Sequence, residues 1–182
     1  MLKRTELANG LILEKSSSDD QIARVWNIEP HGHSKTKELE LKGHADSVDQ
    51  LCWDPKHAEL LATASGDRTV RLWDARSGKC SQQVELSGEN INITFKPDGT
   101  RIAVGNWIDE LSIIDVRKFK PLHKRKFSYE VNEIAWNTTG EIFFLTTGNG
   151  KEISLFLALL LRFNFYVLVF QLVMFSIMSR ED

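Results

Sequence analysis

The stretch "TASGDRTVRLWDARSGK", from Thr63 to Lys79, decides the fold. Two short runs rich in Thr, Val, Ala and Leu stand on either side of the turn-forming residues "SGDR" (65–68), and a second group of turn formers, "RSGK" (76–79), ends the stretch. β-Branched and aromatic residues favour strands, whereas Ser, Gly and Asp favour tight turns. The stretch therefore predicts short strands separated by turns.

The same pattern recurs with a period close to 41 residues. The segments "VDQLCW" (48–53), "NINITF" (90–95) and "VNEIAW" (131–136) each end in an aromatic residue, and these aromatic residues are 42 and 41 positions apart. The segments "VRLWD" (70–74) and "LSIID" (111–115) end in aspartates that are 41 positions apart. A repeat of this length, with several short strands in each unit, predicts a β-propeller.

A partial copy precedes these units, because "SDDQIARVWN" (18–27) overlays "SGDRTVRLWD" (65–74). The chain thus holds the tail of one unit, two full units and most of a fourth. We expect an all-β fold: a partial propeller of about three blades, each a four-stranded antiparallel sheet, over residues 18–155. Residues 1–17 remain unassigned, and residues 156–182 form an apolar tail of uncertain origin.

The repeat region resembles a known family. Gly43-His44, then Asp67 in a turn, then Trp73-Asp74 follow one another as they do in a WD repeat. The chain is therefore identified as a member of the WD-repeat (WD40) family, whose fold is a β-propeller. This resemblance implies the fold but no particular function, since WD propellers serve many processes.

The resemblance also implies one buried structural site. In WD repeats the Trp indole, a strand hydroxyl, the His ring and the turn Asp form one hydrogen-bonded tetrad, here His44, Thr63, Asp67 and Trp73. A His, a Thr and an Asp in one unit also suggest a hydrolase triad. The chain lacks a nucleophile elbow such as Gly-x-Ser-x-Gly, so we interpret the four residues as structural and expect no catalytic residue.

The other units depart from this tetrad. Asp20, six residues before Trp26, suggests half of a second one. In the third unit "LSGEN" (86–90) stands where the Gly-His pair is expected. The positions equivalent to Asp67 and Trp73 are expected to be Ile108 and Ile114 in the third unit, and Asn149 and Leu155 in the last unit.

A narrower resemblance concerns the WD-repeat subunits of the THO complex, part of the transcription–export (TREX) assembly. It is carried by "GHADSVDQLCWDP" (43–55), "TASGDRTVRLWDARSGKC" (63–80), "GENINITFKPDGTRIAVGN" (88–106) and "VNEIAWNTTGEIFFLTTGNG" (131–150). It implies a nuclear, non-enzymatic scaffold in mRNA export that uses no cofactor, binds other THO subunits and contacts RNA mostly indirectly. The alternatives are another WD adaptor, such as a signalling scaffold or ubiquitin-ligase substrate receptor, and a membrane-anchored truncated isoform.

The most basic stretch is "RKFKPLHKRKF" (117–127), between two units. One interpretation is a solvated loop between blades. The other is a contact patch for phosphate groups, because Lys and Arg supply salt-sensitive binding, with Phe119 and Phe127 either as stacking faces or as residues packed between blades. The patch residues are Arg117, Lys118, Lys120, Lys124, Arg125 and Lys126.

Charge and cysteine content narrow the class of protein further. The net charge of −2 gives no overall attraction to nucleic acid or acidic lipid. Two cysteines, Cys52 and Cys80, form no disulfide framework, and neither stands at zinc-site spacing from another Cys or His. We therefore expect a reducing compartment, either nuclear or cytoplasmic, and no bound metal.

The C-terminal run is the last feature. Residues 153–178 are almost wholly apolar, with Arg162, Asn164 and Gln171 as the main interruptions. A run of this length and hydropathy is able to span a membrane, which would make the protein membrane-associated. Two other interpretations stand beside the anchor: a truncated isoform or a gene model that reads into non-coding sequence, and a segment that packs on an open flank of the propeller.

Overall fold

The computed structural model describes the backbone of residues 4–6, 11–14, 21–27, 38–147, 153–157 and 170–172, and the side chains of residues 21–25 and 39–146. Within these ranges the chain forms sixteen strands and no helix. The prediction of an all-β fold is therefore confirmed, and the strands coincide with the short runs of β-branched and aromatic residues.

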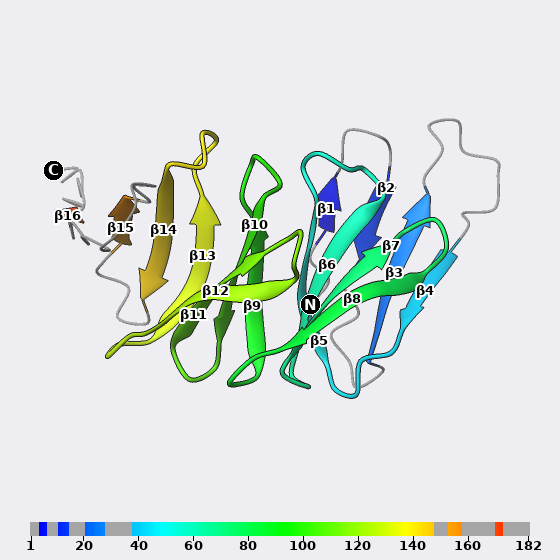
Figure 1. Ribbon diagram of the computed structural model, residues 1–182, viewed down its shortest axis with the longest axis horizontal. Helices are drawn as coiled ribbons and strands as arrows, with labels where there is room; N and C mark the ends of the chain where they lie inside the picture. Colours follow the sequence, from blue (N-terminus) through cyan, green and yellow to red (C-terminus); the bar gives the residue numbers. More distant parts are fainter. Residues whose placement is uncertain are drawn as a thin grey trace, which may run out of the picture.

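The strands form four sheets of four (Figure 1). The first holds β1 (Arg4–Glu6), β2 (Leu11–Glu14), β3 (Ile22–Asn27) and β4 (Glu38–Lys42). The second holds β5 (Val48–Trp53), β6 (Leu60–Ser65), β7 (Thr69–Asp74) and β8 (Lys79–Glu85). The third holds β9 (Asn90–Phe95), β10 (Arg101–Asn106), β11 (Glu110–Asp115) and β12 (Lys120–Lys126). The fourth holds β13 (Val131–Trp136), β14 (Ile142–Thr147), β15 (Ile153–Leu157) and β16 (Phe170–Leu172).

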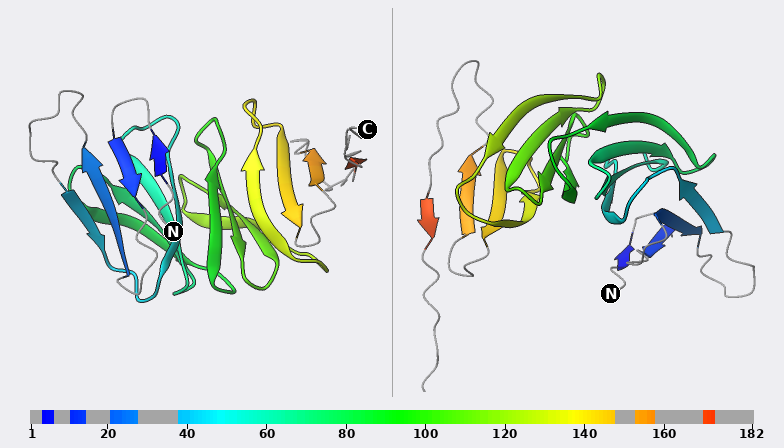
Figure 2. Two further views of the ribbon diagram at one scale, coloured as in Figure 1. Left: turned by 180° about the vertical axis from the view of Figure 1, so that it is seen from behind. Right: turned by 90° about the horizontal axis from the view of Figure 1, so that it is seen from below.

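In every sheet each strand pairs antiparallel with the next one along the chain, and the sheets follow one another around an arc (Figure 2). The first strand of each of the last three sheets lies against its neighbour, because β9 contacts β5 on one side and β13 on the other. This is the arrangement of a partial β-propeller, as expected. Four sheets are present where about three were expected, because residues 4–6, 11–14 and 170–172 also pair as strands.

The hydrophobic core lies between neighbouring sheets, and strands in the middle of a sheet contribute to it from both faces. In β6, Leu61 packs toward the first sheet and the next residue, Ala62, packs toward the third. In β10, Ile102 packs toward the second sheet and Ala103 toward the fourth. Side chains alternate between the faces of a strand, so a sheet enclosed on both sides needs consecutive apolar residues.

The turn between β5 and β6 is organised by a buried carboxylate. Asp54 is only 4% exposed, and its Oδ1 accepts hydrogen bonds from the backbone N–H groups of Lys56 (2.7 Å) and His57 (3.2 Å). Its Oδ2 lies 3.0 Å from Nδ1 of His57. These bonds close the turn around Pro55, which offers no N–H of its own.

Replacing Asp54 by alanine should lower the free energy of unfolding by about 1–3 kcal/mol, because the hydrogen bonds from the backbone N–H groups of Lys56 and His57 to a charged carboxylate are lost. Asp54→Asn keeps the Oδ1 acceptor and should cost less. Lys56→Ala serves as control, since that residue contributes only its backbone N–H, and should change stability by no more than about 0.5 kcal/mol. Urea denaturation followed by circular dichroism measures all three. Equal stability of Asp54→Ala and Lys56→Ala would contradict this role for the carboxylate.

Candidate functional site

Four side chains, from a loop, two strands and the turn between these strands, meet at one end of the second sheet. His44 lies on the loop 43–47 between β4 and β5, and Thr63 and Trp73 lie on the adjacent strands β6 and β7. Asp67 lies in the tight turn that joins these two strands. The structure therefore brings all four members of the expected tetrad together, since strand pairing and one hairpin turn place them within reach of the loop.

The four side chains form one chain of hydrogen bonds. The Trp73 indole N–H donates to Oγ1 of Thr63 (2.8 Å), and this oxygen lies 2.6 Å from Nε2 of His44. Nδ1 of His44 lies 2.9 Å from Oδ2 of Asp67. An indole N–H can only donate and a carboxylate can only accept. The Thr63 hydroxyl must therefore donate to Nε2 of His44, and Nδ1–H of His44 must donate to Asp67.

Asp67 joins the turn to the loop through further bonds. Its carboxylate accepts the backbone N–H groups of Ala45 (3.0 Å) and Thr69 (2.8 Å) and the Thr69 hydroxyl (2.7 Å). Burial raises the pKa of Asp67, but these bonds and the one from His44 outweigh it, so the pKa lies well below its usual value. Thr69 is a fifth member that the sequence analysis missed, although its place two residues after a turn Asp is typical of an Asx-turn.

The loop approaches the sheet closely because its first residue is a glycine. Gly43 has a φ of +152°, a conformation that residues with side chains rarely adopt. A Cβ at this position would lie 2.5 Å from Nη1 of Arg71 and 3.4 Å from the ring of Trp73. The Gly-His pair thus has a steric explanation. The glycine leaves room for the Arg71 side chain, and the following residue, His44, places its ring beside Thr63.

Burial keeps the His44 ring neutral. Burial lowers the pKa of His44 below its usual 6.5, and this effect exceeds the opposing influence of Asp67. A neutral ring with its proton on Nδ1 matches the order of donors and acceptors in the tetrad. The contact with Asp67 is therefore a hydrogen bond from a neutral donor to a carboxylate, and not an ion pair.

The lowered pKa of His44 predicts that stability falls in acid. As the pH falls through 6.5, the unfolded chain takes up a proton on His44 that the folded chain does not bind, so the free energy of unfolding decreases. One proton gives a slope of at most about 1.4 kcal/mol per pH unit. Asp67 adds a loss of the same sign once the pH falls below 3.8.

Urea denaturation at a series of pH values between neutral and mildly acidic measures this slope. His44→Leu should be less stable at neutral pH but should show a flatter profile. His123→Gln, at an exposed position on β12, removes an imidazole without touching the tetrad and should keep the wild-type profile. A wild-type slope retained in His44→Leu would show that other groups cause the acid sensitivity.

The tetrad is closed to substrates. Thr63 and Trp73 are 0% exposed and His44 is 5% exposed. The Thr63 hydroxyl is also engaged on both sides, as donor and as acceptor. A nucleophile must be reachable by the carbon atom that it attacks. The geometry therefore suits a cross-link between a loop and a sheet.

In the third sheet apolar residues take over all four tetrad positions. Val104 pairs with Ser112 as Thr63 pairs with Arg71, and Ile114 pairs with Ile102 as Trp73 pairs with Leu61. The four residues at these positions are Leu86, Val104, Ile108 and Ile114. Three of them, all except Ile108, belong to the core cluster between the second and third sheets. A buried polar network is thus present as a whole in one sheet and replaced as a whole in the next.

The other sheets require one correction. The prediction that Leu155 stands at the position of Trp73 is wrong: Phe156 pairs with Phe143, as Trp73 pairs with Leu61, because the connection contains one more residue. Asn149 and Asp20 lie outside the described residues. Trp26 is placed only through its backbone, on β3, so the expected partial tetrad of Asp20 and Trp26 remains a prediction.

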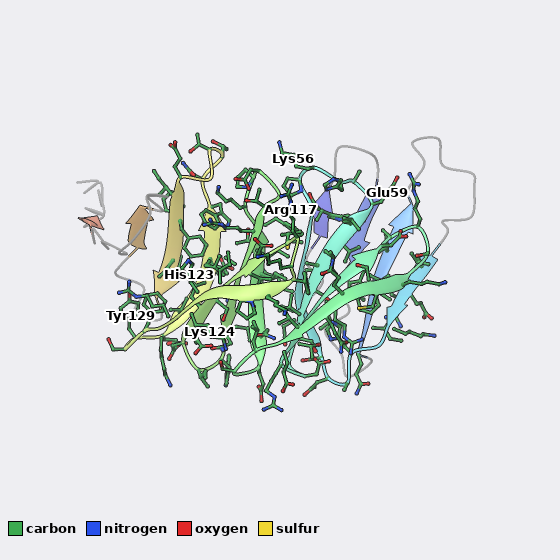
Figure 3. All side chains as sticks on the ribbon, viewed as in Figure 1. Lys56, Glu59, Arg117, His123, Lys124 and Tyr129 are labelled. Carbon is green, nitrogen blue, oxygen red and sulfur yellow. The ribbon has the colours of Figure 1, made fainter. Side chains whose placement is uncertain are left out.

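The basic residues follow the outer strand of the third sheet. Arg117 and Lys118 lie in the turn before β12, and Lys120, Lys124, Arg125 and Lys126 lie on β12 itself. Figure 3 shows Arg117 at one end of this strand and Lys124 farther along it.

Several of these groups are engaged within the chain. Nζ of Lys124 donates to Oγ of Ser87 (2.7 Å) and lies 3.7 Å from Oε1 of Glu110. Arg125 lies over the ring of Phe127, 5.3 Å from its centroid. Phe119 and Phe127 are only 4% and 8% exposed, so they pack between blades and present no stacking face to a base.

The described part of the chain offers neither a metal site nor a membrane-spanning helix. There, no three His, Cys, Asp or Glu side chains converge as metal ligands would. No helix in the ranges described above is long and apolar enough to cross a membrane. Most of the run 153–178 lies outside these ranges, so the predicted anchor is untested.

Comparisons with known proteins agree with this geometry. A family model described as the WD domain, G-beta repeat, matches residues 35–74, which contain the whole tetrad. The chain is 80% identical over 135 residues to THO complex subunit 3 of Arabidopsis thaliana, covering 74% of this chain and 43% of that protein. It is 34% identical over 162 residues to the WD repeat-containing protein AAC3 of Dictyostelium discoideum, covering 79% of this chain and 34% of that protein. The chain thus spans less than half the length of these relatives.

Proposed function

We propose a function from the premise that this chain belongs to the WD-repeat family. It is a non-enzymatic protein-interaction scaffold that acts as a THO/TREX-type subunit in mRNA export coupled to transcription. The observation that carries this proposal is the 80% identity over 135 residues to THO complex subunit 3. The partners are other protein subunits of that complex, and the site of action is the nucleus.

The structure supports a binding role because buried residues hold the loops in place and leave the loop surfaces available for contacts. The tetrad of His44, Thr63, Asp67 and Trp73 acts structurally: it fixes a loop and a turn to the sheet with buried hydrogen bonds. Loops held on a rigid scaffold are the usual place for binding residues. Contact with RNA is mostly indirect in this proposal, because Lys124 and Arg125 on the basic strand are engaged within the chain.

Affinity purification of the full tagged chain from nuclear extract tests the proposal. THO subunits should co-purify with the tagged chain, and a tagged WD protein of unrelated function serves as the matched control. Recovery of a different stable complex without THO subunits would favour the alternative, a signalling or ubiquitin-ligase adaptor. Cell fractionation of the same tagged chain distinguishes a nuclear protein from one that sediments with membranes.

A further inference from the structure

An aromatic side chain stands open to solvent at the tip of one turn. Trp107, in the turn between β10 and β11, is 71% exposed, and the next residue, Ile108, is 41% exposed. In the described ranges only one other large apolar side chain, that of Leu122, is similarly exposed. Exposed apolar groups that adjoin one another are typical of binding surfaces.

The turn belongs to the third of the four sheets, so its exposure does not result from a position in the first or last sheet. The backbone N–H of Trp107 donates to the carbonyl of Glu89 (2.9 Å) on the β8–β9 loop. On its other side, Asp109 accepts the N–H of Phe127 at its carbonyl (2.9 Å) and that of Val131 at Oδ1 (3.1 Å). The turn is thus held between two loops of neighbouring sheets, and its apolar tip points outward from a fixed base.

The fold does not need these side chains at this turn. In the second sheet the equivalent residues are Gly66 and Asp67, and Asp67 is directed inward to the tetrad. The third sheet has no polar tetrad, and its turn is closed instead by Asn106, whose Oδ1 accepts the N–H groups of Ile108 (3.2 Å) and Glu110 (2.9 Å). A small residue at position 107 would preserve all these bonds, so the indole is free for a role outside the fold.

The loops beside the turn are acidic. We define the lower face as the three loops 43–47, 86–89 and 127–130 together with the turn 106–109; these segments lie along the lower edge of Figure 1. Each loop carries one exposed carboxylate and no Lys or Arg. These carboxylates are those of Asp46, Glu89 and Glu130. The charge of Lys124, which reaches Ser87 on the second loop, is matched by Glu110.

We propose that the lower face is a docking surface for an extended protein segment in which an apolar side chain is flanked by Lys or Arg. The apolar side chain packs on Trp107 and Ile108, and a neighbouring cation approaches Glu89. Tryptophan is one of the residue types enriched among the residues that contribute most binding energy at the centre of an interface. The carboxylates of the lower face repel phosphate groups, which disfavours a nucleic acid as the ligand. The proposal rests on the proposed function only in taking the ligand to be protein.

Fluorescence polarisation with the full chain tests the docking surface. The probe is a short labelled peptide in which Lys alternates with Leu; a peptide with Glu in place of Lys and an oligouridylate are the comparison ligands. The Lys–Leu peptide should bind and the other two should not. Trp107→Ala should weaken its binding at least about tenfold, and Glu89→Lys should also weaken it.

Leu122→Ala is the matched control, because Leu122 is 43% exposed on β12, away from the lower face, and should leave binding unchanged. Three outcomes overturn the proposal: no binding of the Lys–Leu peptide, equal effects of Trp107→Ala and Leu122→Ala, or oligouridylate binding that Trp107→Ala weakens. Failure of the proposed function has a different readout, the absence of THO subunits from the purified wild-type chain.

Discussion

Replacing Trp73 by alanine should lower the free energy of unfolding by about 3–5 kcal/mol. The side chain is 0% exposed and packs in the core between the first and second sheets, beside Leu41 and Leu61. Its removal leaves a cavity there, because the surrounding strands are fixed by their ladders. The change also leaves the Thr63 hydroxyl without its donor and uncovers the ring of His44, whose centroid lies 5.9 Å from that of Trp73.

The same substitution at an exposed site provides the control. Trp107→Ala removes an identical side chain from a turn where it is 71% exposed, and it should change stability by no more than about 0.5 kcal/mol. Trp73→Phe keeps most of the buried volume and should fall between the two. Urea denaturation followed by circular dichroism compares the three variants. A Trp73→Ala variant as stable as Trp107→Ala would show that the tetrad does not support the fold.

The strands were predictable from local patterns, and the tetrad was predictable from the resemblance to a WD repeat. Runs such as 48–53 and 90–95 are short, contain β-branched residues, end in an aromatic residue and stand between turn formers, and this pattern predicts a strand. The structure brings His44, Thr63 and Asp67 together because strand pairing and a tight turn convert a fixed spacing in sequence into a fixed position in space.

Features that depend on pairing between distant segments were not predictable. The position assigned to Leu155 belongs to Phe156, because one extra residue in a connection moves every later residue by one position in the ladder. Tryptophan side chains are highly buried on average, so the residue type alone does not predict an exposed Trp107. Its exposure follows from a turn that two neighbouring loops hold in place.

A second pair of substitutions should show how stability depends on a polar or an apolar residue at the same position of two sheets. Thr63→Val removes a buried hydroxyl and leaves the Trp73 indole N–H and Nε2 of His44 without partners, at about 1–3 kcal/mol for each group. Val104→Thr makes the reverse change at the equivalent position of the third sheet. It buries a hydroxyl in an apolar cluster that contains Leu86 and Ile114, and should cost about 1–3 kcal/mol.

Both substitutions change volume little, so the losses measure unpaired polar groups and not cavities. The combined variant His44→Leu, Thr63→Val and Trp73→Ile should lose less stability than the sum of its three single variants, because it removes the network as a unit and installs the residue types that the third sheet already uses. Urea denaturation of the singles and the triple gives the coupling energy. Strict additivity, or a Thr63→Val variant as stable as the wild type, would mean that these bonds do not act as one network.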